Sequence, residues 1–245
     1  MTAYSPDPCD VGPIQPPFRP ARPRADIDAV LRGFMLGVFN TMAGGLALTG
    51  LVAYAAAASG LYAAIAGTPL LWVVVLAPVA LALLLGFGIE RMSPGAARLA
   101  FWSYAALMGL SLAGIFLVYT DASITRVFFI SAGAFAATAA WGYTTRTDLS
   151  RFGSFLFMGL IGIVLASLVN VFLASSAVQF AVSVIGALVF TGLTAYDTQR
   201  LKEMYASTWA GDARGRLATL GALMLYLDFI NLFVSLLQLF GARRD

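Results

Sequence analysis

Two aspartates lie within stretches of this sequence that are otherwise apolar enough for the interior of a membrane. Asp197 follows a long apolar run, in the stretch TAYDTQR, and Asp228 lies inside a second apolar run, in the stretch LYLDFIN. A carboxylate near the centre of a bilayer costs about 2.5–3.5 kcal/mol on insertion scales, so it is retained where a partner or water compensates it. We therefore expect the other helices to house this pair.

If Asp197 and Asp228 meet away from bulk water, their carboxyl groups cannot both ionise cheaply, and the two groups titrate as one unit. With one proton between them, a shared hydrogen bond holds their two helices together. With no proton, they repel each other and form a hard oxygen site that suits Ca²⁺. The pair is therefore expected to act as a pH sensor or gate that can bind Ca²⁺.

The flanking charges leave an alternative open. Asp197 lies just before Arg200 and Lys202, so it can also be an interfacial carboxylate that water or these cations satisfy. Asp228 lies twelve residues beyond Arg216, which is about 18 Å of helix, and has no cation near it in sequence. Asp228 is thus expected to lie about 10 Å deeper than Asp197. The two meet only if the loop between them dips inward or the last helix starts well into the cytoplasm.

Arg91 ends the second apolar segment, directly after Glu90 and on the same predicted side of the membrane as Arg200. It is a natural latch counter-ion for either aspartate, because a nearby cation favours the ionised form of a carboxyl group. The alternative is that Arg91 only snorkels to the interface at a helix end.

A polar stripe follows one face of the last apolar segment. At 100° per residue, Asp228, Asn231, Ser235 and Gln238 fall within an arc of about 80°. Polar groups on a membrane helix must be satisfied by protein or water. We therefore expect this helix to be central, with the stripe facing inward. Asn231, Ser235 and Gln238 either contact ions or form interhelical hydrogen bonds.

Composition places the chain in the membrane. Of 245 residues, 60% are hydrophobic and 11% are charged, whereas a soluble domain has roughly 25% charged residues. The chain has no histidine, which excludes HExxH zinc proteases, Ser-His intramembrane proteases and His-ligated metals. The net charge is +3, but the basic residues are spread over the loops and form no single patch, so no nucleic-acid partner is expected. The lone Cys9 excludes an intramolecular disulfide.

Seven apolar segments follow a proline-rich start. We predict a disordered cytoplasmic tail over residues 1–25 and one transmembrane domain over residues 26–245. The predicted spans are 32–58, 70–90, 97–119, 124–144, 153–173, 177–199 and 217–240. Each is near the roughly 20 residues that cross a bilayer, and turn-forming residues separate them. The fold class is therefore all-α, a polytopic membrane protein with seven transmembrane helices.

The basic residues predict the orientation. With the N-terminus inside, twelve of the fifteen lysines and arginines fall on the inner side and three on the outer side. An excess of lysine and arginine marks the cytoplasmic side, so the N-terminus is predicted to be cytoplasmic and the C-terminus outside. A re-entrant last segment, which would return the C-terminus inside, remains an alternative.

Four stretches make the chain similar to a known family. They are FAATAAWGYTTRTD (residues 135–148), LSRFGSFLFMGLIGIVLASLVNVF (149–172), GLTAYDTQRLKEMY (192–205) and GALMLYLDFINLFVSLLQLFG (221–241). The chain resembles the Bax inhibitor family, also called the transmembrane Bax inhibitor motif family, in its bacterial branch. The resemblance covers about residues 25–244.

The resemblance implies a seven-helix fold whose last helix is central, in a bacterial inner membrane. It also implies a calcium leak set by pH, with a paired-aspartate sensor that matches Asp197 and Asp228. A latch arginine from the second helix is a family feature, and Arg91 is its best match. The expected partners are the lipid bilayer and Ca²⁺ as the permeant or transiently bound ion, with no other cofactor.

A second function stays open beside the channel. The chain could be a membrane scaffold that regulates a membrane-bound protease or a stress or cell-death pathway, with contacts from the tail and from residues 204–216. A retinal-binding pump is excluded, because Lys202 is the only lysine and lies outside the last helix. No nucleophile–base pair or phosphate loop is evident, so we expect no enzyme.

Overall fold

The structure is a computed structural model that describes residues 24–208 and 211–244. The predicted tail over residues 1–25 lies outside the described residues except for its last two, which already belong to the first helix. In the described residues the chain is mainly helical, and strand-type pairing is limited to an isolated bridge between Tyr119 and Arg243.

Seven long helices confirm the all-α, seven-span prediction, and each is long and apolar enough to cross a membrane. Three short elements, α2, α5 and the 3₁₀ turn η1, lie between them. In chain order the elements are α1 (Arg24–Ala58), α2 (Leu61–Ala66), α3 (Leu70–Gly88), η1 (Ile89–Arg91), α4 (Pro94–Leu112), α5 (Ile115–Val118), α6 (Asp121–Thr144), α7 (Ser150–Leu173), α8 (Ser176–Ser207) and α9 (Gly211–Phe240).

Hydroxyl residues begin several of these helices. The side chains of Ser93, Thr120 and Ser175 accept hydrogen bonds from backbone N–H groups three residues on, at the starts of α4, α6 and α8. Such caps satisfy amide groups that a helix start leaves without a partner. The caps therefore explain why helices begin directly after the turns that the sequence predicts near these positions.

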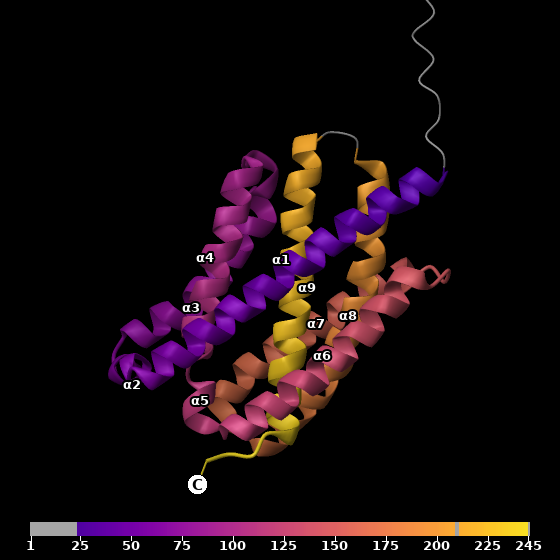
Figure 1. Cartoon of the computed structure of the whole chain (residues 1–245). Helices are drawn as coiled ribbons and strands as arrows, with labels where there is room; N and C mark the ends of the chain where they lie inside the picture. The colour runs from indigo at the N-terminus through magenta and orange to yellow at the C-terminus, as the bar shows by residue number, and fades with distance from the viewer. Residues whose placement is uncertain (1–23, 209–210, 245) are drawn as a thin grey trace, which may run out of the picture.

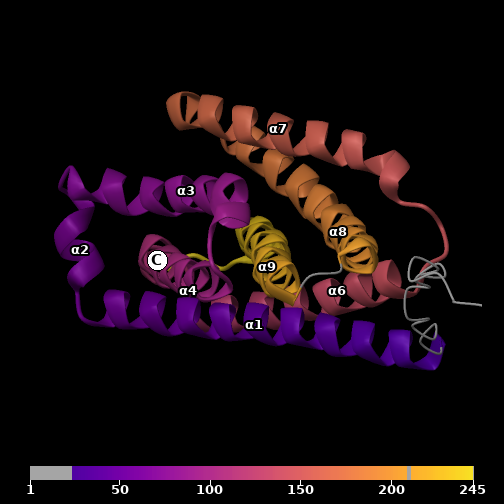
Figure 2. The ribbon, with the colours of Figure 1, turned by 90° about the horizontal axis from the view of Figure 1, so that it is seen from above.

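α9 is the central helix, as predicted (Figures 1 and 2). It packs against α1, α4, α6 and α8. In its most apolar 18-residue stretch 67% of the residues are buried, against 6–33% for the other spans. Tyr226 of α9 shows how tightly it is held: the rings of Phe101 and Tyr104 meet it edge-on, and its hydroxyl forms a 2.6 Å hydrogen bond with Thr49.

α8 and α9 are longer than their predicted spans of 177–199 and 217–240. Both continue as helix through polar residues, α8 to Ser207 and α9 from Gly211. An apolar span ends where the charges begin, but helical hydrogen bonding continues into water. The end of α8 and the start of α9 therefore lie side by side at one end of the bundle (Figure 1).

α9 also crosses the whole bundle. It is one continuous helix of 30 residues, so the re-entrant alternative is not observed. Its end is tied down at the opposite end of the bundle, because the Thr120 N–H donates to the Ala242 carbonyl and the Arg244 N–H donates to the Val118 carbonyl. Arg244 also forms a 2.7 Å ion pair with Asp121.

Gly142 sets the distance between α6 and α8. A Cβ at this position would collide with the backbone of Ala195, two residues before Asp197. Backbone atoms cannot move aside as a flexible side chain can, so only glycine allows the two helices this close approach.

We expect Gly142→Ala to destabilise the protein by about 1–3 kcal/mol, the usual cost of overpacking. Gly133→Ala on the same helix is the matched control, since a Cβ there meets nothing within 4 Å. Thermal unfolding of both variants in detergent measures the difference. Equal melting temperatures for the two variants would contradict the close contact.

Candidate functional site

The two aspartates meet at the contact between α8 and α9. Both side chains are buried, with Asp197 8% exposed and Asp228 4% exposed. Their carboxyl groups lie within hydrogen-bonding range of each other. The structure thus brings together the two residues that the sequence singles out, on the two helices from which they were expected.

The length of α9 explains how residues at different predicted depths can meet. α9 begins at Gly211, seventeen residues or about 25 Å of helix before Asp228. α8 runs only ten residues past Asp197 to Ser207, about 15 Å. The last helix therefore starts well outside the apolar layer, which is one of the two arrangements that the sequence allowed.

Gln199 fixes the position of α8 beside the pair. Its side-chain nitrogen donates to the Thr147 carbonyl and its side-chain oxygen accepts from the Leu149 N–H, both at 2.8 Å. Nearby, the Lys202 ammonium group donates to the Tyr143 carbonyl at 2.6 Å. These bonds tie α8 to the last turn of α6 and to the loop between α6 and α7. Sequence reasoning missed Gln199, although its position two residues after Asp197 in the stretch TAYDTQR was a signal.

One oxygen of the pair lacks a hydrogen-bond partner. Asp228 Oδ2 is buried and accepts no hydrogen bond from any described residue. An unsatisfied buried polar atom costs about 1–3 kcal/mol, and more when it is charged. A proton shared between the two carboxyl groups would lower this cost, because it supplies the donor that acceptor-only carboxylates lack.

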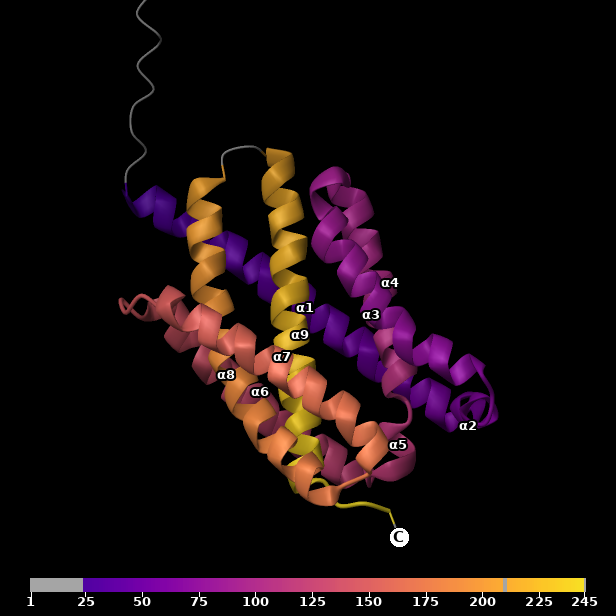
Figure 3. The ribbon, with the colours of Figure 1, turned by 180° about the vertical axis from the view of Figure 1, so that it is seen from behind.

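A cleft of about 970 Å³ leads to the pair. Residues of α3, α4, α7, α8 and α9 line it, including both aspartates, Arg200 and Asn231. α7 forms one wall from Ser150 to Ser167, about 25 Å of helix. Figure 2 shows α3 and α7 on the side of α9 that lies opposite α1, and Figure 3 shows the same side from the front.

A polar turn precedes α7 beside Ser150, one of the residues that line the cleft. The Ser150 N–H donates to Asp148 Oδ1 at 2.9 Å just before α7. Hydrogen bonds from the side chain and the backbone of Ser150 hold the pKa of Asp148 below its usual value. Asp148 is thus an ionised, exposed cap of the loop and no part of the buried pair.

Among the described residues, no hydrogen bond or ion pair joins Arg91 to either aspartate. The 3₁₀ turn η1 packs against α9, but it leaves Arg91 exposed at the end of the bundle, where the side chain pairs with no described residue. The cation that acts on Asp197 is Arg200, three residues further along α8. The assignment of Arg91 as latch counter-ion therefore stays a prediction.

The polar stripe of α9 is divided between two roles. Asn231 lines the cleft and donates to the Leu227 carbonyl of its own helix at 2.8 Å. Gln238 accepts a 2.6 Å hydrogen bond from Ser183 of α8. Ser235 is buried against Gly186 of α8. Gln238 and Ser235 thus contact α8, whereas Asn231 lines the cleft.

The pair alone supplies few ligands for a metal ion. Among the described residues, no group of three or more His, Cys, Asp or Glu side chains could hold a metal ion. Ca²⁺ takes about 6–8 oxygen ligands, and two carboxylates supply at most about four. Ca²⁺ at Asp197 and Asp228 would therefore need water or other oxygens, which fits transient contact better than storage.

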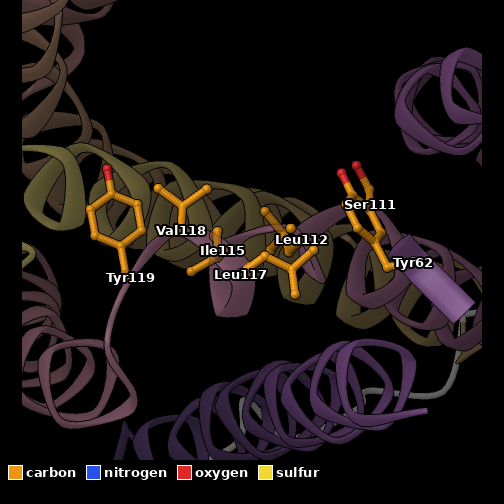
Figure 4. A pocket seen from close by; sticks show the side chains of 8 residues that line it. Tyr62, Ser111, Leu112, Ile115, Leu117, Val118 and Tyr119 are labelled. Carbon is orange, nitrogen blue, oxygen red and sulfur yellow. The ribbon is translucent and has the colours of Figure 1, made fainter. Parts of the chain in front are cut away.

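A second hollow lies beside α2 and α5 (Figure 4). It measures about 380 Å³ and is lined by residues of α2, α4 and α5 and by Tyr119. Its polar side chains are the hydroxyls of Tyr62, Ser111 and Tyr119, with no charged residue among them. Without a charge or an acid–base group, this hollow is a weaker candidate site than the cleft.

Comparisons with known proteins find a family model and several bacterial relatives. Residues 31–245 match the family model described as "Inhibitor of apoptosis-promoting Bax1". The chain is 48% identical over 220 residues to the inner membrane protein YbhL of Escherichia coli, with 88% of this chain and 94% of YbhL covered. It is 46% identical over 235 residues to a protein of Caulobacter vibrioides, with 91% and 94% covered. It is also 44% identical over 219 residues to a protein of Rickettsia prowazekii, with 89% and 93% covered.

Proposed function

Because this seven-helix membrane protein belongs to the Bax inhibitor family, we propose that it is a pH-sensitive leak channel for Ca²⁺ or other cations. The observation that carries the proposal is the buried contact between Asp197 and Asp228 at the end of an open cleft. Buried carboxyl pairs that touch are common at functional sites, because a structural role is served more cheaply by apolar side chains.

The proposed gate uses the charge of the pair. With one shared proton, the two carboxyl groups hydrogen bond to each other and hold α8 against α9. When that proton leaves, two negative charges face each other in a medium of low dielectric constant, and their repulsion favours separation of the helices. The bare carboxylates then attract a hard divalent cation into the cleft. The leak is therefore expected to rise with pH.

The membrane in which the chain lies, and its orientation there, are also part of the proposal. The relative YbhL is named an inner membrane protein, and the same membrane is proposed for this chain. Twelve of its fifteen basic residues are predicted on the side that would face the cytoplasm. The N-terminus is accordingly proposed to be cytoplasmic and the C-terminus to lie on the other side.

The leak can be measured as Ca²⁺ flux into liposomes that contain the purified full chain. Wild-type flux should rise steeply between about pH 6 and about pH 8, since the singly protonated population falls about tenfold per pH unit beyond its midpoint. Asp228→Asn and Asp197→Asn should each give a flux that no longer depends on pH, because one group cannot form a shared-proton pair.

The matched control for flux is Asp212→Asn, an exposed carboxylate in the first turn of the same helix α9. It should keep the wild-type pH dependence. A pair variant that leaks with the wild-type pH dependence would sink the proposed gate. The absence of flux from every protein at every pH would favour the scaffold function instead.

Orientation is tested by thiol labelling of spheroplasts. In a Cys9→Ser background, a membrane-impermeant maleimide should label Ala242→Cys in intact spheroplasts and Ser207→Cys only after lysis. Both positions are exposed and lie at opposite ends of the bundle. Labelling of Ser207→Cys in intact spheroplasts would reverse the proposed orientation.

A further inference from the structure

The cleft beside the aspartates opens sideways, toward the lipid. α3 packs against α4, and α7 packs against α8, so the space between α3 and α7 is bounded by two different helix pairs. Large apolar residues on both sides of it line the cleft and are also exposed at the surface: Val79 and Leu83 on α3, Phe157 and Val164 on α7. In a membrane these side chains face acyl chains, so the cleft is continuous with the hydrocarbon layer.

The inner end of the same cleft is charged, since Arg200, Asp197 and Asp228 line it. Arg200 lines the cleft and forms no hydrogen bond or ion pair with any residue that the structure describes. Asp228 Oδ2 is a fully buried oxygen that accepts no hydrogen bond from the described part of the chain. Asp197 lies three residues before Arg200, a spacing that places two side chains on one helix face with Cβ atoms about 5–6 Å apart.

These charged side chains lie at the depth in the membrane where lipid headgroups are found. Gln199, next to Arg200, is hydrogen bonded to the loop between α6 and α7, which ends the neighbouring spans. Arg200 therefore lies at the boundary of the apolar layer, where the phosphates of one leaflet are found. From there the cleft runs along α7 toward Ser167, deeper among apolar side chains.

We propose that this cleft binds one phospholipid with a zwitterionic primary-amine headgroup, an ethanolamine phospholipid. Its phosphate would bind the Arg200 guanidinium, and its ammonium would bind the carboxyl groups of Asp197 and Asp228. One acyl chain would lie against the apolar walls that α3 and α7 provide.

Charge and hydrogen bonding select this headgroup over others. An ethanolamine headgroup carries a phosphate and an ammonium group, separated by two carbons. Arg200 complements the phosphate, and the carboxyl groups of Asp197 and Asp228 complement the ammonium. A primary ammonium has three N–H donors, as a lysine side chain does, and one of them can supply the donor that Asp228 Oδ2 lacks. A choline headgroup has no N–H donor, and a glycerol headgroup has no positive charge to balance the carboxylates.

This lipid site goes beyond the proposed leak and does not depend on it, because binding requires no conduction. A bound ammonium would occupy the place of the shared proton, so the lipid and the proton would compete for the same two carboxyl groups.

Native mass spectrometry of the full chain tests the proposal. The protein is released from mixed micelles that contain equal amounts of ethanolamine, choline and glycerol phospholipids of the same acyl chains. Wild type should retain one ethanolamine phospholipid per chain. Arg200→Gln and Asp228→Asn should each lower its retention about tenfold or more, as expected for the loss of a charge-assisted hydrogen bond in a low-dielectric site.

Two further variants make the result specific. Arg151→Gln removes an exposed cation at the start of α7 that does not line the cleft, and it should retain lipid as wild type does. Ser154→Trp fills the mouth of the cleft from an exposed position on α7 and should exclude the lipid. Elution of each variant as a single peak on gel filtration establishes that it is folded.

Three results would overturn the proposal. One is equal retention of all three phospholipids, which indicates only an annular lipid. Another is preferred retention of the glycerol phospholipid, which indicates a phosphate site on Arg200 without a role for the carboxyl groups. The third is unchanged ethanolamine phospholipid retention in both Arg200→Gln and Ser154→Trp, which places the lipid elsewhere.

Discussion

The contact between two carboxyl groups, placed where the protein is almost entirely apolar, is the constraint on which the rest of the structure depends. A single ionised carboxylate in such a place is costly, and two in contact are worse unless a proton or a cation lies between them. Several local features hold this contact in place. Gly142 lets α6 approach α8 next to Asp197, Gln199 ties α8 to the loop before α7, and Gly221 of α9 packs closely against Leu201 of α8.

The position of α9 follows from the same constraint. A helix that carries Asp228 and Asn231 cannot face lipid, so it must be surrounded by protein, and four other helices pack around it. Toward the end of α9 the packing against α6 is aromatic: Phe128 and Phe135 meet Phe229, and Phe128 also meets Phe233. The open side of the pair is therefore the side of α3 and α7, where the cleft lies.

The pair and the central helix could be predicted from the sequence because both follow from the cost of polar groups in hydrocarbon. Other features could not be predicted in this way. Hydropathy ends a span at the first charges, so it missed that α8 and α9 continue as helix to Ser207 and from Gly211. The assignment of Arg91 as latch counter-ion rested on its charge and on the family resemblance, and it stays a prediction, since its side chain is exposed on the 3₁₀ turn η1. The cleft depends on which helices pack together, and single segments carry no signal for that.

The central claim is that Asp197 and Asp228 share one proton, and an infrared pH titration of the carboxyl groups tests it most directly. Interacting groups release their protons in two separate steps. The wild-type protein should therefore lose its buried carboxylic C=O absorption in two well-separated steps, and Asp197→Asn and Asp228→Asn should each show one step. A wild-type titration in which both groups lose their protons together, at the pH found for the single variants, would show that the carboxyl groups are independent and would contradict this account.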